Sequence, residues 1–531
     1  MNMVEAPRAG RREWIGLAVI ALPCLLYSMD LTVLHLAVPQ LSADLKPSSA
    51  QLLWIIDIYG FLVAGSLITM GTLGDRIGRR RLLLIGAGAF GIASVLAACS
   101  TSAEMLIATR ALLGIAGATV APSTLSLIRN MFLDQQQRTV AISVWVTSYS
   151  VGAAIGPVIG GVLLQYFWWG SVFLISVPVM ALLLVVGPML LPEYRDPEAG
   201  RPDLISAAMS LAAVLAVIYG LKRIAQDGFE WLPTLSILAG LAVGVAFARR
   251  QLTLADPLID LRLFRVRGFS ASLATYGLGI VVLFGGFLFL PQYLQLVLGL
   301  SPLQAGLWSV PWGVAFVVGS MLTPMIVRHV RPALLMAAGL ALAAPGFAVF
   351  TQVDAATGLA VFVVGTVAFS LGLAPVFTLT TDLIVGSAPP ERAGAAAAIS
   401  ETGAEFGGAL GIAVFGSIGI AVYRGVMASA VPAGVPPDAA EAARATLGGA
   451  VAMAGQLPGQ LGPALVDAAR EAFIQGLRAT AAISVVGSLA LAVFTLVALR
   501  NAGPRGGAES QAESRSRPEP TVASTEIAPG V

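Results

Sequence analysis

The stretch "GTLGDRIGRRR", residues 71–81, joins two long apolar runs and is the part of the chain that is most informative about the fold. Gly71 and Gly78 permit a tight backbone at the end of a membrane span. Asp75, between them, is suited to cap the next helix or to pair with a cation. A positively charged anchor would account for the four arginines of this stretch but not for the Gly–Asp–Gly spacing. The spacing therefore favours a functional role over a simple anchor.

The composition places most of the chain in a lipid bilayer. Hydrophobic residues make up 57% and charged residues 11% of the 531 residues, and the mean hydropathy is +0.85. A soluble domain carries about 25% charged residues, because its surface must be hydrated. Cys24 and Cys99 both lie in apolar runs, so neither a disulfide framework nor a metal site is indicated. The sequence predicts an all-α integral membrane protein without a cofactor or a nucleic-acid partner.

Runs of roughly 20 apolar residues are long enough to cross a bilayer as helices. About fourteen such runs follow one another, so the chain is expected to return to the side on which it starts. Most of the 31 Lys and Arg residues fall in loops on that side, which the positive-inside rule assigns to the cytoplasm. Both termini are therefore predicted to be cytoplasmic. The runs are 14–38, 52–72, 82–100, 104–127, 139–165, 168–192, 204–222, 233–248, 269–293, 303–327, 332–351, 357–386, 394–423 and 474–499.

A faint internal repeat divides the spans into two halves. Span five contains "GAAIGPVIGG" and span thirteen contains "GGALGIAVFG", two Gly-dense segments that lie eight spans apart. This offset fits two six-span halves with two spans inserted between them, and parallel repeats of this kind are typical of secondary transporters. We expect a six-helix bundle at 1–200, two inserted helices at 201–255 and a second six-helix bundle at 256–500.

Two segments fall outside this plan. The connection 424–473 lies on the outer face and contains an Ala-rich stretch, for which a solvated loop and a helical lid are both open interpretations. The tail 501–531 is rich in Ser, Pro, Gly and Glu, so it is predicted to be a disordered cytoplasmic segment.

The motif at 71–81 resembles the loop after span two of the major facilitator superfamily, and in particular of its fourteen-span drug:proton antiporters. Further stretches resemble the same branch: "MDLTVLHLAVP" at 29–39, "LIATRALLGIAGA" at 106–118 and "GAAIGPVIGG" at 152–161. The resemblance implies the major-facilitator fold, with two six-helix pseudo-repeat bundles and two inserted helices. It also implies that the loop motif is a conformational latch between the halves. The residues that match the latch pattern are Gly71, Leu73, Asp75, Arg76, Gly78, Arg79 and Arg80.

The function implied by the resemblance is transport, and the protein is not expected to be an enzyme. It would be a proton-coupled antiporter that exports amphipathic, mostly cationic drugs, such as quaternary ammonium compounds, dyes and antibiotics. Export would occur by alternating access across the bacterial cytoplasmic (inner) membrane, with the proton gradient as energy source. The expected partners are small molecules, protons and the lipid bilayer, and the expected state is a monomer.

The resemblance also marks span five as an antiporter motif, which in this family is associated with export rather than uptake. The physical interpretation is close helix packing, because small residues let helices approach each other in lipid and a proline bends a span. Packing alone does not indicate the direction of transport. The residues concerned are Gly152, Gly156, Pro157, Gly160 and Gly161.

Asp30 is an acid inside an apolar run, where ionisable groups are costly and usually functional. Arg110, a lone cation within span four, needs an anionic partner, and Asp30 is suited to be that partner. A proton on Asp30 would weaken the pair and free Arg110, which would couple charge to conformation. We therefore predict that Asp30 and Arg110 carry proton coupling. The alternative is an inert, structural Asp30 that is bonded to Arg110 or to the backbone.

Three further acids are candidates for cation recognition. Asp57 in span two lies at a depth comparable to that of Asp30, although it also fits an interfacial carboxylate near the outer headgroups. Glu401 and Glu405 in "ISETGAEFGGALG" are spaced i and i+4, so they share one face of a Gly-dense helix. This arrangement suits an organic cation, and the alternative is a polar seam between helices. Asp382 is interpreted as an interfacial or helix-capping acid.

Other classes of transporter are less well supported. Neither lysine of the chain ends a phosphate-binding G-x-x-x-x-G-K-[ST] motif, so the chain has no nucleotide site for a primary pump. A channel or a receptor is disfavoured by the two pseudo-repeats with unevenly placed acids. Two alternatives stay open, an exporter of one endogenous metabolite or self-made antibiotic and, less favoured, an importer of a specific nutrient.

Overall fold

The computed structural model describes residues 8–45, 47, 49–195, 203–227, 230–254, 257–287, 289–354, 358–389 and 393–500. Within these ranges the regular structure is helical and no strand is present. The tail 501–531, for which disorder was predicted, lies outside the described residues.

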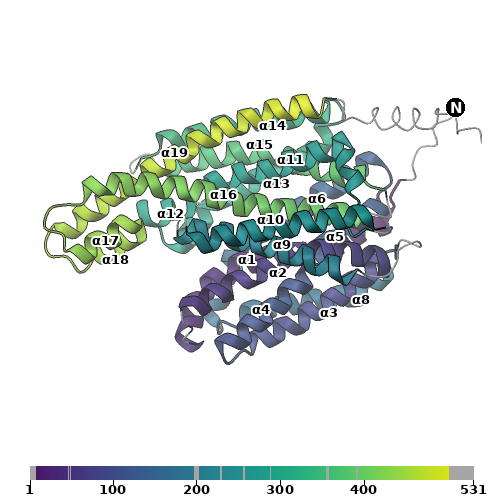
Figure 1. Cartoon of the computed structure of the whole chain (residues 1–531), viewed down its shortest axis with the longest axis horizontal. Coiled ribbons are helices and arrows are strands. Elements are labelled where there is room, and N and C mark those ends of the chain that lie inside the picture. Colours follow the sequence, from purple (N-terminus) through teal and green to yellow (C-terminus); the bar gives the residue numbers. More distant parts are fainter. Residues whose placement is uncertain are drawn as a thin grey trace, which may run out of the picture.

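The first half of the chain forms a bundle of six membrane-spanning units (Figure 1). Two units are each built from a pair of consecutive helices, because the helical pattern is interrupted at residues 118–119 and at Ile175. The helices are α1 (Arg11–Leu45), α2 (Ser49–Ile77), α3 (Arg79–Ala98), α4 (Ala103–Gly117), α5 (Val120–Met131), α6 (Gln135–Tyr166), α7 (Ser171–Leu174) and α8 (Ser176–Leu190).

Two helices then form an inserted hairpin, α9 (Leu204–Asp227) and α10 (Trp231–Thr253). They pack against each other, and α9 also contacts α2 and α16, so it joins the two halves of the chain. At the start of α9, Asp203 pairs with Arg250 of α10 at 3.1 Å. The hydrogen bond from the Ser206 hydroxyl, together with the Arg250 guanidinium, lowers the pKa of Asp203.

The second half repeats the six-unit pattern, with short irregular helices at some of its ends. Its core is dominated by contacts of α14 with α15, of α13 with α15 and of α11 with α16. The helices are η1 (Leu261–Arg265), α11 (Arg267–Phe287), α12 (Leu290–Gln292), η2 (Tyr293–Val297), α13 (Pro302–Ile326), α14 (Pro332–Val349), η3 (Phe350–Gln352), α15 (Gly358–Ser387), α16 (Ala393–Ala430) and α19 (Leu461–Ala498).

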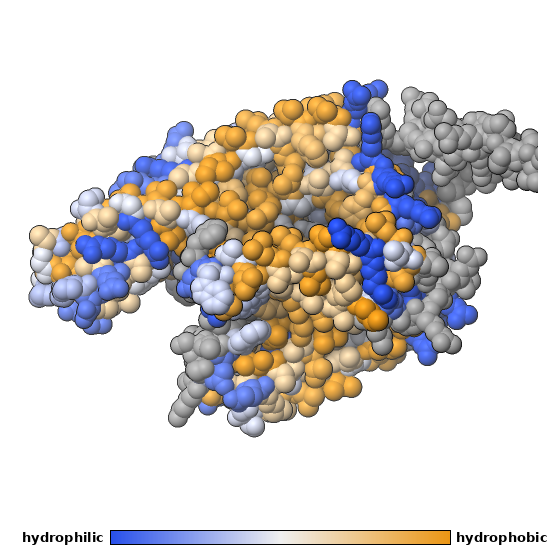
Figure 2. All heavy atoms as spheres, viewed as in Figure 1, coloured by the Kyte–Doolittle hydropathy of each residue, from blue (hydrophilic) through white to orange (hydrophobic). Residues whose placement is uncertain are grey.

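These helices confirm the predicted membrane-spanning architecture. Among the described residues, 13 helical segments are long and apolar enough to cross a membrane, and each overlaps a predicted span. The remaining predicted span, 204–222, corresponds to α9, whose apolar part Ile205–Leu221 is shorter. Figure 2 shows a broad apolar band across the middle of the visible face, with hydrophilic residues gathered toward its two ends, as a bilayer requires.

The connection between the last two spans is helical rather than an irregular loop. The helix α16 continues to Ala430 and α19 begins at Leu461, so both extend beyond the predicted spans. Between them, α17 (Pro437–Ala445) and α18 (Leu447–Ala454) pack against each other at one end of the molecule (Figure 1). The Tyr423 hydroxyl donates a hydrogen bond of 2.6 Å to the Ala443 carbonyl and holds α17 to α16. Of the two open interpretations of 424–473, the structure supports the helical one.

Two glycines of span five lie where α6 packs against α1. A Cβ atom on Gly152 would overlap the backbone carbonyl of Leu25, and one on Gly160 would overlap the side chain of Val33. Gly161 differs, because no atom lies within 4 Å of the position that its Cβ would occupy. Gly156 is buried, and the side chain of Pro157 lies outside the described part of the structure. The packing interpretation of the motif therefore applies to some of its residues and not to Gly161.

We expect Gly152→Ala to lower the melting temperature of the purified protein and Gly161→Ala to leave it unchanged or slightly raised. Both changes gain the same helix propensity, about 1 kcal/mol, so the comparison isolates the overlap with Leu25. Overpacking of this kind costs about 1–3 kcal/mol. Equal melting temperatures for the two variants would show that the space at Gly152 is not required for the contact between α1 and α6.

Candidate functional site

A buried ion pair links three helices of the first bundle. Nη1 of Arg110, on α4, lies 2.6 Å from Oδ2 of Asp30, on α1, and the two side chains are 1% and 14% exposed. Nε of Arg110 donates to the carbonyl of Ile55 on α2, at 3.1 Å. The structure thus brings together the two residues that were predicted to pair. Of the two side chains, that of Asp30 is the more exposed.

Aromatic rings surround this pair. The guanidinium carbon of Arg110 lies 4.7 Å from the ring centroid of Tyr59, which is fully buried on α2. The ring centroid of Tyr27, on α1, lies 6.0 Å from that of Tyr59. The ring centroid of Tyr149, on α6, lies 5.6 Å from that of Tyr27. The rings therefore form a continuous path from the ion pair toward the second bundle.

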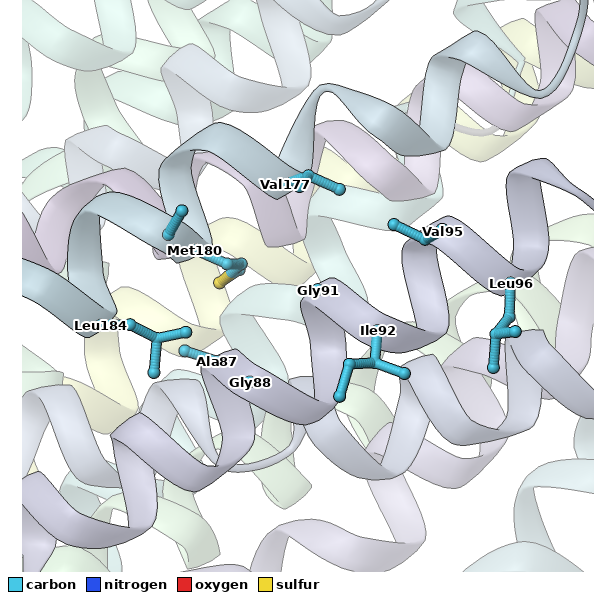
Figure 3. A pocket seen from close by; sticks show the side chains of 10 residues that line it. Ala87, Gly88, Gly91, Ile92, Val95, Leu96, Val177, Met180 and Leu184 are labelled. Carbon is cyan, nitrogen blue, oxygen red and sulfur yellow. The ribbon is translucent and has the colours of Figure 1, made fainter.

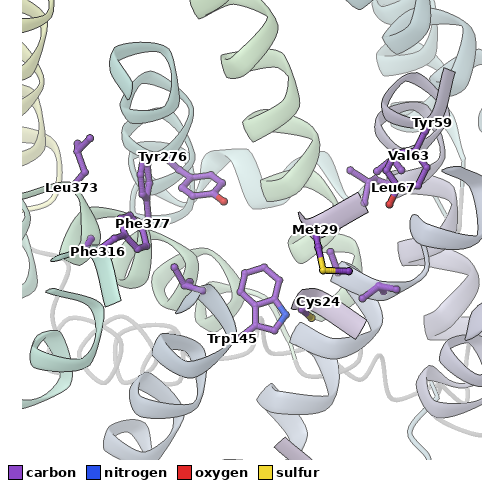
Figure 4. Close-up of a cluster of buried hydrophobic side chains, with 14 of the residues drawn as sticks. Cys24, Met29, Tyr59, Val63, Leu67, Trp145, Tyr276, Phe316, Leu373 and Phe377 are labelled. Carbon is purple, nitrogen blue, oxygen red and sulfur yellow. The ribbon is translucent and has the colours of Figure 1, made fainter. Parts of the chain in front are cut away.

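Further aromatic residues are contributed by both bundles. The ring of Trp145 lies 4.7 Å from that of Tyr149 in a tilted arrangement, and in Figure 4 its indole is seen beside Cys24 of α1, with Tyr276 of α11 on the other side of the view. Tyr276 in turn packs against Phe377 of α15 at 5.7 Å. Both bundles thus contribute aromatic surface to one central region.

Glu401 and Glu405 face this central region from α16. The Tyr276 hydroxyl donates to Oε1 of Glu401 at 3.4 Å, and Glu405 interacts with the hydroxyl of Tyr27 from the opposite bundle. Both carboxylates are half-buried, and they lie about 12 and 18 Å along the axis from the start of α16. Two acids beside aromatic faces can bind a cation through charge and through cation–π contacts.

Asp57, the third candidate for cation recognition, lies on α2, but its side chain is outside the described part of the structure. Among the described residues, no group of three or more His, Cys, Asp or Glu side chains is arranged to hold a metal ion.

The motif at 71–81 packs the first bundle against the second at one end of the molecule. We call this end the basic end, because α2 meets α3 there among four arginines. A Cβ on Gly71 would lie 2.6 Å from the Cβ of Ala398 and 2.8 Å from the carbonyl of Gly394, both on α16. Asp75 and Arg79 form a buried ion pair, and the Arg79 guanidinium occupies the space beside Gly394. The glycine at position 71 is thus required by a close approach between the bundles.

The rest of the motif is held by a residue that the sequence analysis did not single out. Gly78 has a φ angle of +110°, which favours glycine, and it precedes α3. Glu193, after α8, accepts hydrogen bonds from the backbone N–H groups of Arg80 and Arg81 at 3.1 and 3.2 Å. It thereby satisfies free N–H groups at the start of α3. Arg76 lies half-buried in the last turn of α2.

Asp382 is buried between the bundles, which differs from its interpretation as an interfacial or capping acid. From α15 it accepts hydrogen bonds from three side chains of α6. Nε2 of Gln135 and Nε of Arg138 each donate at 2.9 Å, and the Thr139 hydroxyl donates at 3.0 Å. The sequence signal that could have located this contact is the polar "DQQQRT" segment that opens span five.

An apolar groove lies on another face of the first bundle, between α3 and α8 (Figure 3). Gly88 and Gly91 leave the space, and Ile92, Met180 and Leu184 are among its walls. No charged side chain lines the groove, so it lacks the counter-charge that a cation requires and is separate from the central acids.

Comparison with known proteins identifies a family and several curated relatives. The model of the Major Facilitator Superfamily matches residues 20–412. The multidrug efflux pump LfrA of Mycolicibacterium smegmatis is 42% identical, over 93% of this chain and 97% of that protein. The methyl viologen resistance protein SmvA of Salmonella typhimurium is 39% identical, over 90% of this chain and 96% of that protein. A tetracenomycin C resistance and export protein of Streptomyces glaucescens is 33% identical, over 94% of each chain.

Solved structures show the same fold at low sequence identity. The human organic anion transporter MFSD10 superposes with a TM-score of 0.61 and 15% identity, covering 91% of this chain and 99% of that one. A bacterial homologue of the human lysosomal transporter Spinster superposes with a TM-score of 0.55 and 20% identity, and the match covers 93% of this chain and 98% of that one.

We expect Arg110→Gln to destabilise the purified protein by about 3–5 kcal/mol, because it leaves the Asp30 charge buried without its partner. The double variant Asp30→Asn/Arg110→Gln should recover part of this loss. The matched control is Arg250→Gln, whose ion pair with Asp203 is partly exposed and should contribute less than about 1 kcal/mol. Thermal unfolding measures all three, and equal shifts for Arg110→Gln and Arg250→Gln would contradict the assignment of a buried, charge-compensated pair.

Proposed function

The chain belongs to the major facilitator superfamily, and from this premise we propose that it is a proton-coupled antiporter that exports amphipathic, mostly cationic drugs by alternating access. The proposal is supported above all by Glu401 and Glu405, two acids on one face of α16 that meet aromatic rings of both bundles. Relatives over nearly the full chain are a multidrug efflux pump and a methyl viologen resistance protein. Quaternary ammonium compounds, cationic dyes and cationic antibiotics have the matching chemistry of charge and apolar surface.

Recognition of a cation would use the two acids together with the rings. An organic cation placed between Glu401 and Tyr276 would replace the hydrogen bond of 3.4 Å that now joins them, which is long and therefore weak. The rings of Tyr27 and Trp145 offer apolar faces on the opposite side. We assign Asp57 to the same site from its predicted depth in the sequence.

Proton coupling would reside in Asp30. In the ionised form it holds the Arg110 guanidinium against α1 and α2. Protonation removes the negative charge, so the attraction falls and Arg110 is free to adopt another partner. A change that reaches three helices in this way can favour one conformation of the bundle over another. Asp30 and Arg110 would therefore couple protonation to conformation, whereas Glu401 and Glu405 would bind the drug.

The basic end would face the cytoplasm. The excess of Lys and Arg in the loops at this end follows the positive-inside rule, and it would place both termini in the cytoplasm of a bacterial cell. The motif with Asp75 and Arg79 would then act as the conformational latch on the cytoplasmic side, as its close contact with α16 supports. We retain the division into bundles at 1–200 and 256–500 with inserted helices at 201–255, and a monomer as the transporting unit.

A second candidate is a dedicated exporter of one antibiotic that the same cell makes. It is favoured by the identity of 33% over nearly the whole chain to a tetracenomycin C resistance and export protein. The two candidates differ in substrate range and not in fold or energy source. Competition among chemically unrelated cations for one transport activity supports the drug pump, and transport of one compound alone supports the dedicated exporter.

The energy source is tested in inside-out membrane vesicles loaded with a proton gradient. Ethidium or methyl viologen should accumulate in vesicles that contain the protein, and an uncoupler should abolish the accumulation while ATP is still present. The expectation follows from the absence of a phosphate-binding motif in the sequence. Accumulation that survives the uncoupler and stops on removal of ATP would sink the proposal.

Substitutions of the two sets of acids should have different effects. Asp30→Asn should stop transport of every substrate and still permit binding, because the proton step is lost while the cation site remains. Glu401→Gln or Glu405→Gln should weaken binding of some cations more than others. Each lost charge-assisted contact contributes about 1.5–3 kcal/mol, which is roughly a 10- to 150-fold change in affinity.

Asp203→Asn serves as the control, because its ion pair with Arg250 is confined to the inserted helices. It should leave both transport and affinity at the parental values. The assignment of proton coupling to Asp30 and of cation binding to Glu401 and Glu405 would be wrong if Asp30→Asn still transported one substrate at the parental rate. It would also be wrong if both Glu variants kept the parental affinity for every cation.

A further inference from the structure

Asp382 is the centre of a polar cluster that crosses from one bundle to the other. Its side chain is 4% exposed and that of Arg138 is 7% exposed, so both charges are removed from water. The three donors to Asp382 are spaced i, i+3 and i+4 on α6, so they lie on one face of that helix. A single acid of α15 therefore binds three side chains at the start of α6.

The cluster lies at the basic end of the molecule. Gln135 is the first residue of α6, and α6 begins where α5 ends after its return from the opposite end. Asp382 lies five residues before the end of α15. Separation of the bundles at this end would break all three hydrogen bonds together, because every donor is on α6 and the acceptor is on α15.

This contact is independent of the motif at 71–81. That motif uses α2 and α3 against the start of α16, through Gly71, Asp75 and Arg79. The Asp382 cluster uses α6 and α15, a different pair of helices. The basic end is thus held shut at two places. Only the Asp382 cluster does so with an ion pair whose two members belong to different bundles among the described residues.

A buried charge is stable only while its hydrogen bonds are made, and a partner left alone in the interior is costly. Removal of one member of the pair therefore destabilises the closed basic end, where the other charge is left buried, and not the open one, where water hydrates it. Such an interaction affects the equilibrium between the conformation closed at the basic end and the conformation open at that end. Among the hydrogen bonds and ion pairs given above for the described residues, none joins the Asp382 cluster to the central acids Glu401 and Glu405.

We propose that Asp382, with Gln135, Arg138 and Thr139, forms a lock between the bundles that holds the basic end closed and sets the population of the conformation open at that end. The inference rests on the proposed function, because an alternating-access transporter must open at this end during its cycle and the basic end is assigned there to the cytoplasm. Asp382 acts here as a positioning residue and does not contact substrate.

Thr378 provides a reporter of this opening. It precedes Asp382 by four residues, so it lies on the same face of α15 one turn deeper. Its side chain is fully buried, and its hydroxyl has no hydrogen-bond partner in the described structure, so Thr378→Cys removes no bond. The native cysteines are replaced in the background by Cys24→Ala and Cys99→Ser. A membrane-impermeant maleimide added to inside-out vesicles then reports access from the basic end.

Asp382→Asn should raise the labelling rate of Thr378→Cys roughly tenfold or more, the shift in population expected from one lost charge-assisted hydrogen bond. Arg138→Gln should act in the same direction. The double variant should label no faster than the faster single variant, because both changes break one interaction. Asp203→Asn, which neutralises an ion pair within the inserted helices, is the matched control and should label at the parental rate.

Thr139→Val covers the case in which Asp382→Asn does not insert into the membrane. It removes one neutral donor from the cluster and should raise labelling roughly two- to fivefold. Parental labelling in a correctly inserted Asp382→Asn protein, or in Thr139→Val, would overturn the lock.

Transport of ethidium measured in the same vesicles separates this inference from the proposed function. Faster labelling in a protein that shows no proton-driven transport supports the lock and refutes the antiport proposal. Proton-driven transport with unchanged labelling refutes the lock alone.

Discussion

The structure depends on a simple electrostatic constraint, which is that a charge inside the membrane must have its partner beside it. The Asp30–Arg110 pair meets this constraint with a contact of 2.6 Å and a further hydrogen bond to the α2 backbone. It fixes α1, α2 and α4 relative to one another in a region where water does not compensate a lone charge. The same constraint makes the pair sensitive, because one proton on Asp30 leaves Arg110 without its counter-charge.

The constraint recurs at the basic end, where it operates between bundles rather than within one. Asp382 and Arg138 compensate each other only while α6 and α15 are in contact. The central carboxylates Glu401 and Glu405 are in a different setting, since Glu401 accepts a hydrogen bond from Tyr276 and Glu405 interacts with the hydroxyl of Tyr27. The buried ion pairs thus lie within the first bundle and at the basic end, whereas the two acids of α16 lie beside aromatic rings of both bundles.

The sequence was sufficient for the features that depend on local patterns. Apolar run length predicted the spans, and an acid in span one with a lone cation in span four predicted the Asp30–Arg110 pair, because a cation within a span needs an anionic partner. The partners of Asp382 and the capping role of Glu193 were not predicted, since several polar residues near the helix ends were equally available and only the packing of the bundles selects among them. The helical form of 424–473 also depends on tertiary contacts, such as the bond that fixes α17 to α16.

The most direct test of the account is the release of protons when substrate binds to the purified protein in weakly buffered solution. If the proton is carried by Asp30 and the cation by the central acids, addition of methyl viologen should release protons from the parent protein in proportion to the amount bound. The Glu401→Gln variant should release them at a higher substrate concentration, whereas Asp30→Asn should bind substrate and release none. Undiminished proton release from Asp30→Asn, together with its loss in Glu401→Gln, would contradict the assignment and place the proton on the acids that bind the drug.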